Sequence, residues 1–70
     1  METENTHVQG TVYNNLGSAY QSLGDFWKAI EFHQLALSVA KETGNRYSQG
    51  KTYINLGLAH QSLNDFEKAF

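Results

Sequence analysis

The segment Gly50-Lys51-Thr52 is the part of the chain whose residues could most directly do chemistry, because Gly-Lys-Thr ends a phosphate-binding loop. The apolar residues 35–40 could then form the strand that precedes such a loop. Two observations oppose nucleotide binding. Five residues separate Gly44 from Gly50 where the motif requires four, and 70 residues leave no room for the parallel sheet that such a loop terminates. We therefore retain it only as a remote alternative.

Three histidines are the next candidates, because imidazole is a common metal ligand. His7, His33 and His60 are never three or four residues apart, and the chain has no cysteine that could complete a zinc site. His33 lies within an apolar helical stripe, so we expect a packed side chain with one nitrogen hydrogen-bonded. The sequence predicts no catalytic residue, no metal site, no cofactor and no enzymatic activity.

A third set of candidates has side-chain amides and hydroxyls along one helix face, repeated forty residues later. Asn15 and Asn55 occur in both copies, and an amide can donate to and accept from the backbone of an extended peptide. Ile54 and Leu58 would add an apolar surface beside these amides, against which a partner could pack. The alternative is an ordinary solvated face. The predicted groove comprises Thr11, Asn14, Asn15, Ser18, Gln21, Lys51, Ile54, Asn55, Leu58 and Gln61.

These residues are positioned by an internal repeat. Residues 5–30 recur as residues 45–70, with fifteen of twenty-six pairs identical. A period of this length is typical of stacked structural repeats, each of which buries its apolar face on a neighbour. We expect one segment over residues 1–70, with a first repeat at about 5–44 and a second at about 45–70, truncated in its second helix. The chain would then be a fragment of a longer array.

Apolar spacings of three and four predict helices at about 6–22, 26–42 and 46–62, and a fourth beginning near Phe66. Turns are expected near Gly24, Gly44 and Asn64, the last because asparagine is the commonest substitute for glycine in a left-handed conformation. Asn5, Asp25 and residue 45 are candidate N-caps.

Composition limits the possible partners. The net charge is −2 and charged residues make up 17% of the chain, which disfavours nucleic acid and an anionic membrane as main partners. The polar N-terminus is unlike a signal peptide, and no apolar stretch is long enough to span a bilayer. We expect a soluble cytoplasmic protein that is either marginally stable or self-associating when isolated, since fewer than two repeats are present.

The pattern Tyr13-x-x-Leu16-Gly17-x-x-Tyr20 followed by Ala29, and its second copy Tyr53-x-x-Leu56-Gly57-x-x-His60 followed by Ala69, resembles the tetratricopeptide repeat. The forty-residue period is similar to the Pins/LGN-type subgroup of scaffolds. The resemblance implies an all-α fold of antiparallel helix-turn-helix repeats stacked in a right-handed solenoid. It also implies a concave groove, formed by the first helix of each pair, that binds a partner peptide or helix. A structural spacer or oligomerisation repeat without its own ligand is the alternative.

Overall fold

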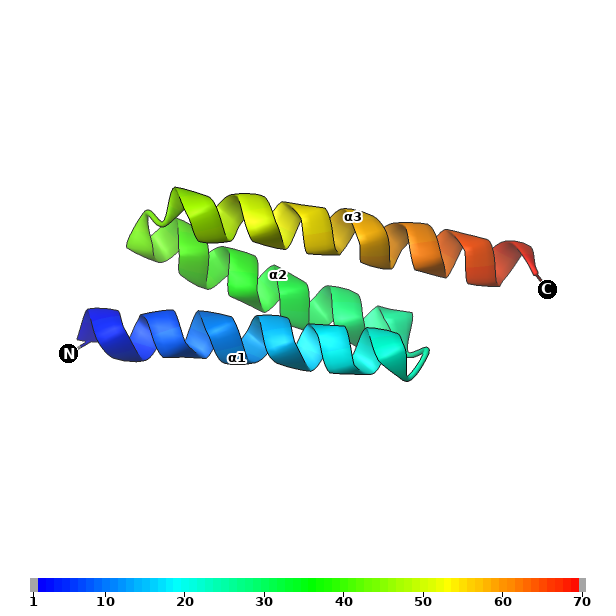
Figure 1. Cartoon of the computed structure of the whole chain (residues 1–70), viewed down its shortest axis with the longest axis horizontal. Helices are drawn as coiled ribbons and strands as arrows, with labels where there is room; N and C mark the ends of the chain where they lie inside the picture. Colours follow the sequence, from blue (N-terminus) through cyan, green and yellow to red (C-terminus); the bar gives the residue numbers. More distant parts are fainter. Residues whose placement is uncertain (1, 70) are drawn as a thin grey trace.

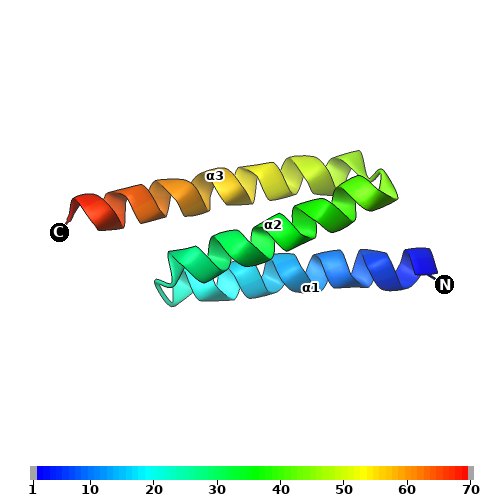
Figure 2. The ribbon, with the colours of Figure 1, turned by 180° about the vertical axis from the view of Figure 1, so that it is seen from behind.

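Three α-helices account for nearly all of the chain. The computed structural model describes residues 2–69, and the side chains of residues 8–69. The helices are α1 (Glu2–Ser22), α2 (Phe26–Thr43) and α3 (Arg46–Lys68). α1 and α3 run in the same direction, and α2 runs antiparallel between them (Figures 1 and 2). Residues 2–69 contain no strand, so the predicted all-α class is confirmed.

The first turn forms where the sequence predicts it. Gly24 has a φ of +84°, a left-handed conformation that glycine adopts without steric cost. The N–H of Asp25 donates to the carbonyl of Tyr20 at 2.9 Å, which closes the end of α1. Asp25 then caps α2, since its carboxylate accepts from the backbone N–H of Lys28 at 3.2 Å.

The second turn has the same design. Gly44 has a φ of +68°, and the N–H of Asn45 donates to the carbonyl of Ala40 at 2.9 Å. The side chain of Asn45 accepts from the N–H of Ser48 at 3.0 Å and so begins α3. These two turns fold α2 back against α1, and α3 back against α2.

The predicted third turn at Asn64 is wrong, and the fourth helix predicted from Phe66 is absent as a separate element. α3 continues through Asn64 to Lys68, and no non-glycine residue among those described has a positive φ. A helix from Phe66 would contain only five residues here, and nucleating so short a helix is unfavourable. Continuing α3 instead places the ring of Phe66 5.9 Å from that of Phe26.

The start of α1 also differs from the prediction. The helix begins at Glu2 rather than near Thr6, so Asn5 lies inside the helix and is not its N-cap. The side chain of Asn5 lies outside the described side chains.

The core lies on both sides of α2. Ala29 and Ile30 of α2 pack with Ala59 and Leu63 of α3, and Tyr20, Phe26 and Leu56 border this cluster. Ala36, Ala40 and His33 of α2 are also buried. The sequence predicts this burial, because two apolar stripes run along residues 26–42 and such a helix must be covered on two sides.

Gly17 and Gly57 occupy the same position of the internal sequence repeat but have different surroundings. A Cβ on Gly17 would lie 2.7 Å from the His33 ring, so α1 and α2 approach closely there. The group opposite Gly17 is thus His33. A Cβ on Gly57 would meet nothing within 4 Å, because none of the helices within residues 2–69 covers that side of α3.

Candidate protein-binding groove

A hollow of about 180 Å³ lies between the middle of α1 and the N-terminal half of α3, and the C-terminal half of α2 forms its floor. The helices bring polar side chains to its rim from both sides, while small and aliphatic side chains of α2 line its base. Its lining residues are Gly10, Thr11, Asn14, Asn15, Ala36, Val39, Ala40, Thr43, Asn45, Tyr47, Ser48 and Lys51.

The structure brings four of the ten predicted groove residues together in this hollow: Thr11, Asn14, Asn15 and Lys51. Asn15 and Lys51 are exposed on opposite helices. The other six predicted residues do not line it: Ser18, Gln21, Ile54, Asn55, Leu58 and Gln61. Of these six, Gln21 and Asn55 are half-buried and the remainder are exposed.

Asn14 holds the floor of the hollow rather than lying open to a ligand. Its side-chain Nδ2 donates to the hydroxyl of Thr52 at 3.0 Å, and its Oδ1 lies 2.9 Å from Nδ1 of His33. Thr52 and His33 are both buried. One amide therefore joins all three helices. The sequence does not indicate this role, because the equivalent position of the second copy of the repeat is the apolar Ile54 and no polar residue recurs there.

His33 is the packed histidine that the sequence predicts, with one nitrogen hydrogen-bonded. Since Oδ1 of Asn14 can only accept, Nδ1 of His33 carries the proton and donates it. Nε2 is buried and has no hydrogen-bond partner among the described residues. Burial lowers the pKa of His33 from its ordinary value of 6.5, so the ring is neutral at physiological pH.

A second polar link between α1 and α3 lies nearer to the first turn, outside the hollow. The amide of Gln21 donates to the hydroxyl of Ser62 at 3.5 Å, so it connects α1 to α3 beyond Asn14. Like Asn14, Gln21 therefore contributes to helix packing. The side chains of the predicted groove thus divide into a structural floor and an exposed rim.

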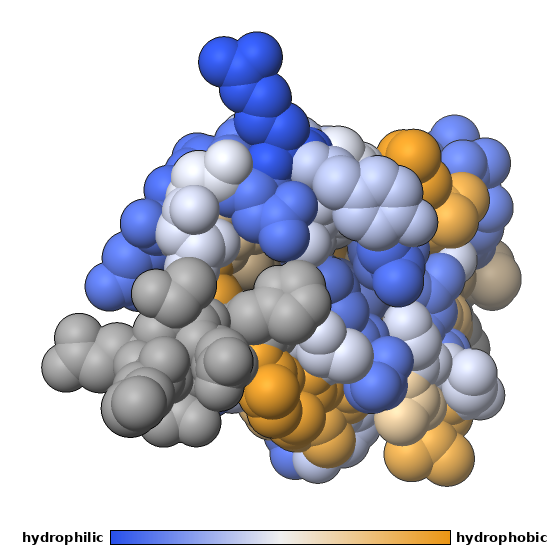
Figure 3. All heavy atoms as spheres, turned by 60° about the vertical axis from the view of Figure 1, so that its left-hand side comes forward, coloured by the Kyte–Doolittle hydropathy of each residue, from blue (hydrophilic) through white to orange (hydrophobic). Residues whose placement is uncertain are grey.

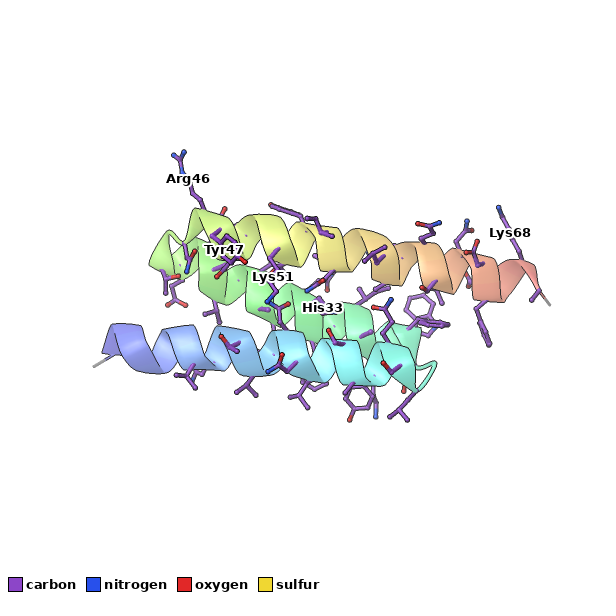
Figure 4. All side chains as sticks on the ribbon, viewed as in Figure 1. His33, Arg46, Tyr47, Lys51 and Lys68 are labelled. Carbon is purple, nitrogen blue, oxygen red and sulfur yellow. The ribbon has the colours of Figure 1, made fainter. Side chains whose placement is uncertain are left out.

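Lys51 gives the rim its charge. It is the one charged residue among those that line the hollow. Figure 4 shows its side chain reaching from α3 toward α1, whereas Arg46 points away from the three helices. Among the described side chains, Lys51 forms no ion pair, and Asn15 has no hydrogen-bond partner. These two polar groups remain available to a ligand.

The structure also adds rim residues that the sequence analysis missed. Tyr47 and Ser48 line the hollow, and Tyr47 is 81% exposed. They lie four and three residues before Lys51, which places them on the same face of α3. That helical spacing was the signal that could have identified them.

The nucleotide-binding alternative is inconsistent with the backbone. Residues 35–40 lie inside α2, and Gly50-Lys51-Thr52 lies inside α3. The sequence therefore has neither the strand nor the loop that a phosphate-binding motif requires. Over the described residues, no three histidine, cysteine or acidic side chains are grouped to hold a metal ion, and the side chain of His7 lies outside that part.

None of the helices, over the residues that the structure describes, is both long enough and apolar enough to cross a bilayer.

A family model of the tetratricopeptide repeat matches residues 8–70, which is most of the chain. The chain belongs to the tetratricopeptide repeat family. Comparisons with curated proteins and with solved structures gave no match. Tetratricopeptide repeats are typically non-enzymatic scaffolds and generally bind protein partners. In this tetratricopeptide repeat chain, α1 and α3 carry equivalent parts of the internal sequence repeat, and the hollow lies between them.

Proposed function

We propose that this chain binds an extended peptide of a partner protein in the hollow between α1 and α3. The observation that carries the proposal is the hollow itself, about 180 Å³, with a polar rim above a small-residue base. A peptide backbone could approach the base of the hollow closely, because the side chains of Ala36 and Ala40 are small and Gly10 has none. The rim supplies hydrogen-bonding groups from both sides.

Asn15 and Lys51 would make the main polar contacts. The amide of Asn15 can donate to a peptide carbonyl and accept from a peptide N–H at the same time. Lys51 can donate to a carbonyl or pair with an acidic side chain. Asn55, Ser18 and Leu58 lie beyond the hollow along α1 and α3, where they would contact a longer peptide.

The organisation of the predicted repeats supports this proposal. We assign residues 5–44 to the first repeat and residues 45–70 to the second, so that α1 and α3 occupy equivalent places. The forty-residue period favours the Pins/LGN-type subgroup of scaffolds, which this chain resembles in sequence. Asn15 and Asn55 would then form the start of a repeated row of amides.

Nuclear magnetic resonance tests the proposal directly. A peptide selected by display against the whole chain would be titrated into the ¹⁵N-labelled protein. We expect the largest shift changes at Thr11, Asn15, Ser48 and Lys51, and small changes at Gln34 and Lys41 on the outer face of α2. Changes confined to the outer face of α2 would refute the groove assignment.

A second candidate, an oligomerisation repeat, is favoured by a specific feature of α1. Val8, Val12 and Leu16 share one face of α1, and their exposed fractions are 58%, 46% and 38%. Figure 3 shows apolar side chains exposed among hydrophilic ones at the end of the molecule that it brings forward. A monomer at all concentrations in sedimentation equilibrium would eliminate self-association as the function.

A further inference from the structure

The imidazole of His33 has a buried nitrogen that the network of the three helices does not use. The ring lies at the middle of α2 (Figure 4), is 1% exposed, and donates from Nδ1 to Asn14. Its Nε2 is closed off from solvent and has no hydrogen-bond partner among the described residues. A neutral ring tolerates this burial, because Nε2 then carries neither a proton nor a charge. A protonated ring would bury a charged N–H donor, which is costly without a partner or water.

α1 lies directly on one face of this ring. A Cβ on Gly17 would lie 2.7 Å from Nε2 and from Cε1 of His33, and 2.8 Å from Nδ1. The backbone of α1 at Gly17 therefore fills the space above the imidazole. Water can reach Nε2 only if the helices around the ring separate, so protonation favours a state in which α1 has moved away from α2.

The described side chains of the three helices place no charged group against the ring. Residues 8–22 of α1 include no acidic or basic side chain, and their two tyrosines, Tyr13 and Tyr20, stack on Phe32. The acidic and basic residues of α2 and α3 are exposed, including Lys51. Burial is accordingly the cause that lowers the pKa of His33 from its ordinary value of 6.5.

The same network forms part of the hollow. Asn14 accepts from His33, donates to the hydroxyl of Thr52 at 3.0 Å, and lines the hollow. α1 also contributes Thr11 and Asn15 to the lining. A movement of α1 away from His33 would therefore break the bond between Asn14 and Thr52 and displace one wall of the hollow.

We propose that His33 is a proton switch that controls the hollow: the neutral ring keeps α1 seated on α2, and protonation of Nε2 opens the network. This inference rests on the proposed function, since the ligand that it regulates is the peptide bound in the hollow. Peptide binds the closed arrangement and the proton binds the open one, so each weakens the binding of the other. Histidine suits this role because its charge changes close to physiological pH.

Acidification should weaken peptide binding. Because burial lowers the pKa of His33 in the closed arrangement, the ring is neutral at pH 7.5 and the hollow is closed there. Affinity should be highest above about pH 6.5 and should fall as the pH falls through the lowered pKa. One linked proton limits the loss to about tenfold per pH unit. Bound peptide should in turn lower the pKa of His33 further.

Nuclear magnetic resonance of the whole labelled chain without peptide, from pH 7.5 to pH 5.0, tests the switch itself. The Cε1–H shift of His33 reports protonation, and the nuclear Overhauser contact between the side chains of Asn14 and Thr52 reports the closed network. We expect this contact to disappear with the midpoint of the His33 titration, while circular dichroism still shows a helical chain. A contact that persists in the protonated chain would overturn the proposal. So would loss of all helical signal in the same range, because protonation would then unfold the chain rather than open the hollow.

Fluorescence anisotropy tests the link to binding, with a peptide from the display selection that has no titratable side chain and has blocked ends. Any pH dependence of its affinity then arises in the protein. The wild-type chain should bind it up to about tenfold more weakly for each pH unit below the His33 midpoint. A constant affinity, in a chain whose contact between Asn14 and Thr52 is lost, would overturn the proposal and leave the groove assignment intact.

His33→Gln should abolish the pH dependence of peptide affinity, since glutamine does not titrate and still offers an N–H to Asn14. Should that variant not fold, His33→Phe serves instead, because it keeps a flat ring against Gly17. His60→Gln is the matched control and should retain the dependence, because His60 is exposed and does not line the hollow. Equal pH dependence in the wild-type and His33→Gln chains would overturn the proposal. If no peptide bound at pH 7.5, the groove proposal alone would fail, and the titration of the free chain would still decide whether the switch exists.

Discussion

His33 and Asn14 form the buried hydrogen bond that joins α2 to α1, with Nδ1 of the imidazole 2.9 Å from Oδ1 of the amide. The same amide donates to Thr52 of α3. The three helices are thus connected by one polar side chain in an interior that otherwise consists of alanines, aliphatic side chains and aromatic rings. Because each group in this set depends on the others, the network fixes how α1 and α3 are placed on α2.

Replacing Asn14 by alanine should destabilise the fold. It would leave the Nδ1–H of His33 and the hydroxyl of Thr52 buried without partners, at a cost of about 1–3 kcal/mol each. Urea unfolding followed by circular dichroism would measure the loss. Asn15→Ala is the matched control, because the exposed amide of Asn15 makes no described contact and should change stability by less than about 0.5 kcal/mol. Equal stability of the two variants would contradict the network.

Stability should fall as the pH falls below about 6.5. Burial lowers the pKa of His33 in the folded chain below 6.5, so the unfolded chain takes up the proton first. The contribution of His33 is therefore fully present above pH 6.5 and is lost as the pH falls toward the lowered value. The free energy of unfolding should change by at most about 1.4 kcal/mol per pH unit in this window.

Urea unfolding at pH 7.5 and at pH 5.5 would test this dependence. His33→Gln should remove the part of the slope due to His33, since glutamine does not titrate and still offers an N–H to Asn14. Gln34→Ala, which changes an exposed side chain that does not titrate, should keep the wild-type slope. An unchanged slope in His33→Gln would show that other groups cause the pH dependence.

Alanine at Gly17 and alanine at Gly57 should have opposite effects, although the two glycines occupy the same repeat position. Gly57→Ala adds a methyl group in open space and should stabilise α3 by up to about 1 kcal/mol through helix propensity. Gly17→Ala places a methyl group 2.7 Å from the His33 ring, and overpacking costs about 1–3 kcal/mol. Thermal midpoints of the two variants give the comparison, and a higher midpoint for Gly17→Ala would contradict the close approach of α1 and α2.

The two equivalent turn positions should also respond differently to alanine. Gly24→Ala forces a side chain into a left-handed conformation and should destabilise the chain by about 1–2 kcal/mol. Asn64→Ala lies inside α3 and should stabilise the helix slightly, because alanine has the higher propensity. Destabilisation by Asn64→Ala would indicate that a turn forms there in solution.

Much of the fold could be predicted because local signals and burial agree. Gly24 and Asp25, and likewise Gly44 and Asn45, combine a left-handed residue with a cap, and both turns form. At Asn64 the sequence repeats the first turn but the structure does not, because a separate helix from Phe66 would gain too little packing. Local sequence at that position does not determine the outcome; the presence of a helix to pack against does.

The site was harder to predict than the fold. The repeat identified the helix faces that line the hollow, but it could not show which polar side chains are used internally. Asn14 and Asn15 are adjacent and of the same type, yet one is held by two buried partners and the other is exposed. That difference depends on His33 and Thr52, which are nineteen and thirty-eight residues away from Asn14.

The affinity of a groove-binding peptide for two double variants tests the central claim most directly. Asn15→Ala with Lys51→Ala removes the two rim groups proposed to make the main polar contacts, without disturbing the floor. Gln34→Ala with Lys41→Ala changes the outer face of α2 and is preferable to a control at Lys28, whose Nζ lies 5.2 Å from the centre of the Tyr20 ring. Fluorescence anisotropy should show at least about tenfold weaker binding for the rim variant and unchanged binding for the control. The reverse order of affinities would contradict the groove and assign peptide binding to the outer face of α2.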